Sequence, residues 1–340
     1  MKKRNDGRYQ KSITINGKRH VFYGKSQAEI NRKILEFQTN AENGKTFGEV
    51  ADEWADEHFT KIEYSTARRY KRLKTAITDE VGNMYINEIK SNDIIRFLRK
   101  LSAQDYSSKT IKDQLSVIKM IFKYAVIQKY ISNNITEYIT PEKGKKAVAR
   151  QPLTDKEIAV VNNSIDCTFG FFVYFLLYTG LRKGEALALK WSDIDFKNKT
   201  INVINSVYHE SNTPKIKPPK TDAGVRTVIL LDCLYDKLKE RYKPNETYVF
   251  NYNGELINSG MYNRRWKKYQ QETNTSFTAH QLRHTFATLL FEANINVKDA
   301  QVLMGHSDIS VTQNIYTHIR QSRISQTANA LNSFINSQNN

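Results

Sequence analysis

Cysteine is scarce in this sequence, which holds only Cys167 and Cys233 among its 340 residues. Two cysteines are too few for a disulfide framework, and neither belongs to a CxxC or Cys/His spacing of the kind that binds zinc. We therefore expect no structural disulfide, no metal site built from cysteines, and a reducing compartment, the cytoplasm.

Long apolar runs are also missing. The most apolar segment, residues 169–181, ends at Arg182-Lys183 and is shorter than the roughly 20 residues that a membrane-spanning helix needs. The basic N-terminus is not followed by the apolar stretch of a signal peptide. We interpret 169–181 as a buried core helix and expect no association with a membrane.

Acidic residues are too few to balance the basic ones, since 35 Asp and Glu face 52 Lys and Arg, a net charge of +17. Such an excess attracts polyanions, of which nucleic acid is the commonest in cells, although a solvated basic surface is the alternative. Hydrophobic residues make up 39% and aromatic residues 11%, enough for a folded core. The length predicts two domains, with room for a small third one.

The first 45 residues are strongly basic, with eleven Lys and Arg against four acidic residues. Two β-prone runs, 9–15 and 18–23, flank Asn16-Gly17, a strong signal for a β-hairpin. Ser26 and Glu29 have the spacing of a capping box, which predicts a helix from there to about residue 38. We interpret 1–45 as a DNA-binding module, in which Lys18 and Arg19 beside the turn are candidate phosphate contacts.

Residues 46–140 have helical periodicity and predict a helical domain with two long apolar faces. Proline, glycine and charge then break the pattern, so 141–149 is predicted to be a linker. The apolar faces consist of Phe47, Val50, Ala51 and Trp54, and of Ile111, Leu115, Ile118, Phe122 and Ala125.

A third region, 150–340, opens with a capping box at Thr154 and Glu157. Two β-prone runs, 200–207 and 225–230, are separated by a basic loop that contains prolines, so this region mixes helices with a small sheet. The predicted fold class is multidomain and mainly α with small β elements (α+β): a hairpin and helix module, a helical domain, and a mixed third domain.

Four stretches of the third region carry residue types that phosphodiester chemistry requires. Arginines keep their protons and can clamp the non-bridging oxygens of a negatively charged transition state. A tyrosine hydroxyl becomes a nucleophile when a base or a cationic field helps to remove its proton. The stretches are 179–185, 219–221, 280–284 and 303–306, with a tyrosine ten residues after the last one.

Specific roles can be assigned to these residues. Arg182 and Arg283 are candidates for the clamp, Tyr316 for the nucleophile and His280 for its base. Arg283 and His280 have the spacing of residues on one face of a helix.

The leaving 5′-oxygen needs a proton, which a lysine in a flexible loop can deliver. Lys220 fits this role, although Lys215 and Lys217 lie in the same loop and any of the three could contact phosphate only. His306 is a candidate donor of a hydrogen bond to a phosphate oxygen. We expect Glu185 to orient a neighbour or to cap a helix.

This set of residues resembles the tyrosine recombinase family, also called the phage integrase family. Its members carry an arginine in a TGxRxxE stretch, a lysine in a β-hairpin, an HxxR pair, a His or Trp after LxG, and a nucleophilic tyrosine. The resemblance is specific over about residues 150–335, and 46–140 and 1–45 look like the core-site and arm-site DNA-binding domains. It implies catalytic roles for Arg182, Lys220, His280, Arg283, His306 and Tyr316.

The resemblance implies a site-specific recombinase that integrates, and also excises, a mobile element of a phage or conjugative transposon. Tyr316 would form a 3′-phosphotyrosyl link without ATP, a metal or any other cofactor. The implied partners are double-stranded attachment sites, three further copies in a DNA-bound tetramer, an excisionase and a host DNA-bending protein. The apolar stripe of Ile324, Ala328, Leu331 and Ile335 would pack on a neighbouring subunit. The protein is then expected on the nucleoid.

Several alternatives stay open at this point. A resolvase-type tyrosine recombinase would share the chemistry without arm sites, and a type IB topoisomerase would share it without a preferred sequence. A DNA-binding regulator on the same fold would lack the chemistry altogether. His280 and His284 also have a spacing that suits a metal ion, but position 281 is Gln and no third ligand is evident, so we expect His284 to be a structural contact.

Overall fold

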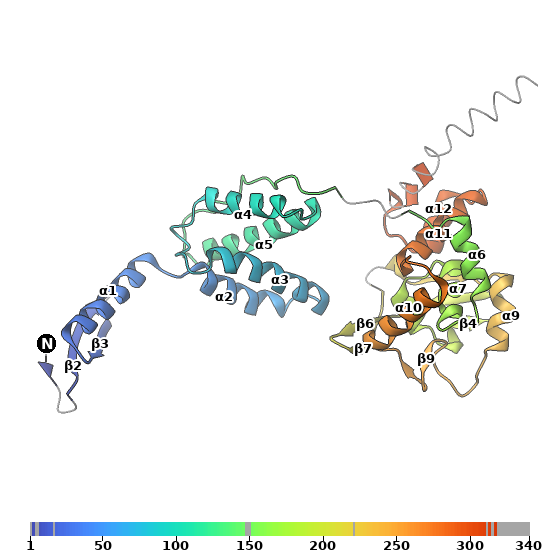
Figure 1. Ribbon diagram of the computed structural model, residues 1–340, viewed down its shortest axis with the longest axis horizontal. Helices are drawn as coiled ribbons and strands as arrows, with labels where there is room; N and C mark the ends of the chain where they lie inside the picture. The colour runs from blue at the N-terminus through green and yellow to red at the C-terminus, as the bar shows by residue number, and fades with distance from the viewer. Residues whose placement is uncertain are drawn as a thin grey trace, which may run out of the picture. The chain divides into compact units, whose positions relative to one another are not determined.

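The computed structural model describes residues 2–3, 7–15, 18–146, 151–219, 222–310, 312–313 and 316–317 (Figure 1). The chain divides into two compact units, Met1–Val148 and Ala149–Asn340. Helices dominate both units and the sheets are small, which confirms the predicted α+β class with mainly helices. Within the described residues, no helix has both the length and the apolar character that crossing a membrane requires.

The basic N-terminal segment forms the predicted hairpin and helix. Strands β1 (Lys2–Lys3), β2 (Tyr9–Ile15) and β3 (Lys18–Gly24) make an antiparallel sheet in that order. Ile15 pairs with Lys18, which leaves the two-residue connection that Asn16-Gly17 predicts. Helix α1 (Gln27–Asn43) packs on β2 and β3.

The segment differs from the prediction in two details. Strand β1 was not predicted, because two residues are too short to give a pattern. Helix α1 also continues beyond the predicted end at Gln38 as far as Asn43. No glycine or proline occurs between Gln27 and Asn43, and the helix ends before Gly44, which has a φ of +79°.

Four helices build the rest of the first unit. Helices α2 and α5 carry the two predicted apolar faces, and every residue of those faces is buried in one core. The packing of α5 against α2, α3 and α4 therefore confirms the periodicity. The helices are α2 (Phe47–Phe59), α3 (Tyr64–Val81), α4 (Ser91–Ala103) and α5 (Ser108–Ile127).

Of the predicted linker, residues 141–146 are described and contain no helix or strand. They are attached to the start of α5, because the Lys145 N–H donates to the Tyr106 carbonyl and the Ser108 N–H donates to the Lys145 carbonyl.

The second unit begins with the predicted capping box. Thr154 accepts the Glu157 N–H, and the Glu157 carboxylate accepts the Thr154 N–H, which starts α6 (Asp155–Asn163). The predicted core helix is α7 (Gly170–Thr179), whose Phe172 and Phe175 are buried. Helix α7 packs against α11 (Ala279–Glu292) and so places the two arginine-bearing stretches side by side.

The β-elements of this unit are more divided than predicted. Strands β4 (Ile194–Asp195), β5 (Thr200–Val203) and β8 (Arg226–Ile229) form one antiparallel sheet in that order. Strands β6 (Ser206–Glu210) and β7 (Thr213–Lys217) form a separate hairpin. The run predicted over 225–230 contains β8, whereas the run predicted over 200–207 is divided between β5 and β6, and the predicted loop between the two runs contains β7. Lysines and a proline are poor strand formers, which removed the signal.

Neither cysteine forms a disulfide. The predicted stripe over 324–335 lies outside the described residues.

The second unit contains further helices and strands. The elements are α8 (Lys183–Ala188), η1 (Trp191–Asp193), η2 (Asp222–Gly224), α9 (Asp232–Glu240), β9 (Asn251–Tyr252), β10 (Glu255–Leu256), α10 (Ser259–Thr273) and α12 (Val297–Met304).

Candidate active site

The C-terminal end of α12 is the framework of the site. Gly305 follows the helix with a φ of +62°, and its N–H donates to the Val302 carbonyl at 3.0 Å. The next N–H, of His306, donates to the Gln301 carbonyl at 3.2 Å. This pair of bonds is a Schellman motif, which leaves the three carbonyls from residue 303 to residue 305 without a partner inside the helix.

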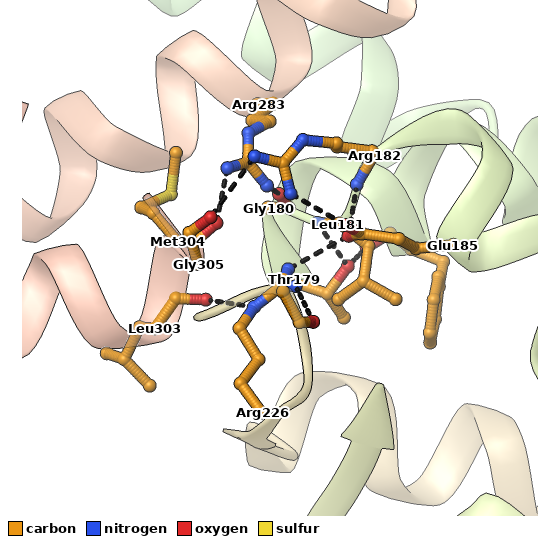
Figure 2. Close-up of polar contacts among 12 residues, drawn as sticks. Thr179, Gly180, Leu181, Arg182, Glu185, Arg226, Arg283, Leu303, Met304 and Gly305 are labelled. Atoms are coloured by element: carbon orange, nitrogen blue, oxygen red, sulfur yellow. Dashed lines mark hydrogen bonds and ion pairs between the residues drawn. The ribbon is translucent and has the colours of Figure 1, made fainter. Parts of the chain in front are cut away.

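Three arginines from other elements donate to these three carbonyls, one each (Figure 2). Because the carbonyls at a helix C-terminus carry partial negative charge, cations are stabilised there, and the bonds also satisfy backbone acceptors that would otherwise be buried unpaired. The pairs are Arg226 Nε with the Leu303 carbonyl (2.9 Å), Arg283 Nη2 with the Met304 carbonyl, and Arg182 Nη2 with the Gly305 carbonyl (3.2 Å).

The carboxylate of Glu185 joins two of the arginines. Its Oε1 accepts from Arg182 Nη1 at 2.7 Å, and its Oε2 accepts from Arg226 Nη2 at 2.9 Å. The same Oε2 accepts the Arg182 backbone N–H at 2.9 Å and so caps the first turn of α8. Glu185 therefore orients a neighbour and caps a helix, as the sequence predicts for it.

The close approach of α11 explains why the residue between Thr179 and Leu181 is a glycine. Gly180 has a φ of +63°, and a Cβ there would lie 2.2 Å from the ring of Phe286 on α11. The carbonyl of Gly180 accepts from Arg283 Nη1 at 2.7 Å. The glycine thus lets α7 and α11 approach closely enough for Arg283 to bond to the backbone before Arg182.

Burial and neighbouring charges shift the pKa values of the buried groups. Burial alone would raise the pKa of Glu185, but the hydrogen bond and charge of Arg226, together with the bonds from Arg182, lower it below its ordinary value. Burial, followed by repulsion from Arg182 and Arg226, lowers the pKa of Arg283 to about 9. Both groups are consequently charged at neutral pH.

His306 follows α12 directly and lies beside the arginines. Burial and the charges of Arg283, Arg182 and Arg226 lower its pKa to about 4, so its ring is neutral at pH 7. Ring Nδ1 is 2.9 Å from the hydroxyl of Thr312. The structure therefore brings His306 together with both predicted clamp arginines.

His280 lies in the first turn of α11 and lines a hollow of about 580 Å³. Arg182 and Arg283 line the same hollow, and His280 is exposed. The side chain of Arg283 is buried, whereas that of Arg182 is 47% exposed. Both arginines therefore reach the hollow, and Arg182 is the more accessible of the two.

Tyr316 lies away from these hollows. Its hydroxyl donates to the Ile295 carbonyl at 3.3 Å, and its ring packs edge-on against Phe291. Burial raises the pKa of this tyrosine. Tyr316 lines neither the 580 Å³ hollow nor a second one of about 330 Å³ between Arg182 and Pro219.

Other predicted residues fall partly outside the described part of the chain. Lys220 is one of them, while Lys217 lines the hollow of about 330 Å³ beside Arg182. Lys18 is placed only as the first residue of β3. Arg19 donates from Nη2 to the Ser12 hydroxyl at 3.3 Å across the hairpin.

Arg226 is a residue that the sequence analysis missed. It starts β8, where Arg226 and Val228 face inward and Thr227 faces outward. A charged residue at an inward position of a short strand was the signal that could have found it, because a buried charge needs a partner.

Comparison with known proteins identifies the family. Residues 155–323 match the phage integrase family, and residues 47–142 match the phage integrase central domain. A tyrosine recombinase XerC-like protein of Caldanaerobacter subterraneus subsp. tengcongensis is 32% identical over 95% of this chain and 95% of its own length. The chain belongs to the phage integrase family of tyrosine recombinases. This recombinase therefore acts on DNA in site-specific recombination.

The recombinase also shares its fold with solved integrases. An integrase of transposon Tn1549, in complex with a circular intermediate DNA, has a TM-score of 0.67 and 24% identity, covering 83% of this chain and 100% of that chain. A lambda integrase tetramer bound to a Holliday junction has a TM-score of 0.62 and 20% identity, covering 90% of this chain and 94% of that chain. A transposon integrase and lambda integrase thus share the fold.

Proposed function

We propose that this recombinase integrates and excises a mobile element through a covalent bond between Tyr316 and a DNA 3′-phosphate. The tyrosine oxygen attacks the scissile phosphorus, the new bond to phosphorus forms, and the bond from phosphorus to the 5′-oxygen breaks. The 5′-oxygen takes up a proton and leaves as a hydroxyl. A 5′-hydroxyl of a partner strand then reverses the reaction, so the bond energy is kept and no ATP is consumed.

The proposed roles follow the chemistry of each side chain. Arg182 and Arg283 hold the non-bridging oxygens, and His306 donates a hydrogen bond to one of them. A neutral His306 suits this role if the Thr312 hydroxyl donates to Nδ1, because the proton then resides on Nε2. His280 takes up the proton of Tyr316, and Lys220 protonates the leaving 5′-oxygen.

The support for this proposal comes above all from the way the arginines are held. Backbone carbonyls hold both arginines, and Glu185 also holds Arg182, so the protein itself orients the pair. Donors that are already oriented need not reorganise when charge develops in the transition state, which is the main source of electrostatic catalysis. A surface that only bound DNA would gain little from such order.

Attack requires a movement of Tyr316. In the described arrangement its hydroxyl is bonded to the Ile295 carbonyl and its pKa is raised by burial. We propose that binding of DNA and of neighbouring subunits releases this contact and brings the hydroxyl to the phosphate between the arginines. The cations then lower the cost of removing the tyrosine proton.

We further propose how the other parts of the chain contribute. Residues 1–45 would bind arm sites, residues 46–140 would bind core sites, and residues 150–340 would cut and rejoin the strands as a tetramer. The chain would act in the cytoplasm on the nucleoid, and an excisionase and a host DNA-bending protein would set the direction of the reaction. The net charge of +17 suits this extended contact with DNA phosphates.

A covalent-trapping experiment tests the proposal. Nicked duplexes derived from DNA flanking the protein's own gene are incubated with the wild type and with Tyr316→Phe. We expect an adduct with a free 5′-hydroxyl from the wild type only, because phenylalanine has no nucleophile, while both proteins bind the duplex alike. An adduct that persists in Tyr316→Phe would contradict the assignment, and tight specific binding without any adduct would favour a regulator.

A further inference from the structure

Arg226 is a buried charge outside the six proposed catalytic residues. Its side chain is only 3% exposed, and all three of its side-chain nitrogens donate hydrogen bonds. Nε donates to the Leu303 carbonyl at 2.9 Å, Nη1 to the Gly224 carbonyl at 3.2 Å, and Nη2 to Glu185 at 2.9 Å. A charge placed in a core loses its hydration, so a complete set of partners is the condition for keeping it there.

The ion pair with Arg226 determines how Glu185 acts on Arg182. One carboxylate oxygen of Glu185 accepts from Arg182, and the other accepts from Arg226, so two guanidiniums share one negative charge. Without Arg226 the full charge of Glu185 would act on Arg182 and would repel an incoming phosphate. With Arg226 in place, the pair of arginines keeps a net positive charge for the phosphate.

The other two hydrogen bonds of Arg226 hold two further elements, α12 and η2. The Leu303 carbonyl lies in the last turn of α12, three residues before His306. The Gly224 carbonyl lies at the end of η2. One side chain thus connects α8, α12 and η2, although it starts a different element, β8.

The neighbouring glycine shows how closely Arg226 fits. A Cβ on Gly305 would lie 2.9 Å from both Cδ and Nη1 of Arg226. The guanidinium therefore occupies the space next to the backbone that binds Arg182, and a shift of either group would displace the other.

We infer that Arg226 is a positioning residue for strand cleavage, which neutralises Glu185 and holds the ends of α12 and η2 so that Arg182 stays directed at the scissile phosphate. It acts through Glu185 and the backbone and does not contact the DNA itself. The inference rests on the proposed function, in which Arg182 binds that phosphate.

The test is a double-mutant cycle on strand cleavage by the full-length protein. Single-turnover adduct formation on the nicked flanking duplex is measured for the wild type, Arg226→Met, Glu185→Gln and the double variant. Affinity for the same duplex is measured in parallel. Arg241→Met serves as a matched control, because Arg241 is in the same unit, stacks on Phe171 and pairs with Asp166 outside the site.

We expect Arg226→Met to lower the cleavage rate by about tenfold or more while the affinity changes by less than about threefold, since a transition-state contact is disturbed. The double variant should cleave faster than Arg226→Met alone, because removing the charge of Glu185 relieves the repulsion. Arg241→Met should cleave like the wild type. If the loss of cleavage rate in the double variant equals the product of the losses in the two single variants, Arg226 and Glu185 are not coupled and the inference is overturned.

A conservative variant keeps the inference testable if Arg226→Met does not fold, which urea unfolding of each variant reveals. Arg226→Lys retains the charge but cannot reach all three partners, so we expect it to fold and to cleave at an intermediate rate. Cleavage by Arg226→Lys at the wild-type rate would show that the geometry is irrelevant and would overturn the inference.

An NMR titration gives a readout that a general loss of stability would not produce. The ring signal of His306, assigned with His306→Gln, should titrate at a higher pH in Arg226→Met because one neighbouring cation is gone, and should stay near the wild-type value in Arg226→Lys. An unchanged titration in Arg226→Met would argue that Arg226 does not act on the site.

The cleavage assay distinguishes failure of the proposed function from failure of this inference. If the wild type forms no adduct, both fail. If the wild type forms the adduct and Arg226→Met forms it at a rate within twofold of the wild type, only the inference is overturned.

Discussion

At the residue scale, the arginines of this site are fixed mainly by backbone acceptors. The carbonyls of Gly180 and of residues 303–305 accept from three guanidiniums, and Glu185 is the carboxylate that joins two of them. Since these bonds form within the protein, the cationic group is in place before any phosphate arrives.

The backbone at Gly305 leads to a stability prediction. Gly305→Ala adds a Cβ at positive φ and places it against Arg226, so we expect a loss of about 2 kcal/mol in the free energy of unfolding and slower cleavage. Gly254→Ala is the matched control, because Gly254 also has a positive φ, +83°, but no described atom lies within 4 Å of its added Cβ. The control should lose about 1 kcal/mol and cleave normally. Equal losses in urea unfolding would contradict the contact with Arg226.

The neutral ring of His306 leads to a pH prediction. Its pKa falls from 6.5 to about 4 on folding, so between these pH values the unfolded chain binds a proton that the folded protein does not. Stability should therefore fall as the pH is lowered from about 6.5 towards 4, and His306→Gln should remove this part of the loss. Urea unfolding of both proteins across that range gives the difference, and curves that stay parallel would show that His306 does not contribute.

At the scale of elements, helix ends place the proposed catalytic groups. Thr278 caps α11, whose first turn carries His280, and Glu185 caps the start of α8 after Arg182. The Schellman motif at the end of α12 places His306. The position of each of these side chains is therefore set by a helix cap more than by the middle of a helix.

Two matching caps separate stability from catalysis. Thr278→Ala and Thr154→Ala each remove a capping box, and each should lower the free energy of unfolding by about 1 kcal/mol. Only Thr278→Ala should also slow adduct formation, because the first turn of α11 carries His280, whereas α6 carries no proposed catalytic residue. Equal cleavage rates for the two variants would show that His280 does not depend on this cap.

The elements that could be predicted from the sequence are those with local signals. Asn16-Gly17 predicts a hairpin and Thr154 with Glu157 predicts a helix start, because the partners lie within a few residues of one another. The role of Arg226 could not be predicted, since its partners Glu185 and Leu303 are 41 and 77 residues away in the chain. The proposed chemistry of the site rests on residue types, whereas the contacts that hold those residues depend on the tertiary fold.

At the scale of the whole molecule, charge and modular organisation set how the recombinase meets DNA. The first 45 residues, with eleven Lys and Arg against four acidic residues, form a sheet and helix of their own. Such a density of cations releases counterions on binding, which makes affinity fall steeply with salt.

Deletion of residues 1–45 distinguishes an integrase from a resolvase. An integrase should lose recombination at long attachment sites but keep cleavage of a short core duplex, because the proposed catalytic residues lie beyond residue 150. The salt dependence of DNA binding should also become weaker, since phosphate contacts are lost. Full recombination by the shortened protein would favour a resolvase-type enzyme, and loss of core cleavage would show that the first module takes part in catalysis.

The carbonyls at the end of α12 have a consequence for how this enzyme can vary over time. Every residue has a backbone carbonyl, so the acceptors of Arg226 and Arg283 do not depend on which side chains stand at positions 303 and 304. Position 305 has no such latitude, because only glycine fits both the backbone and the space. Natural variation and directed evolution can therefore alter the exposed side chains of α12, whereas position 305 must keep its glycine.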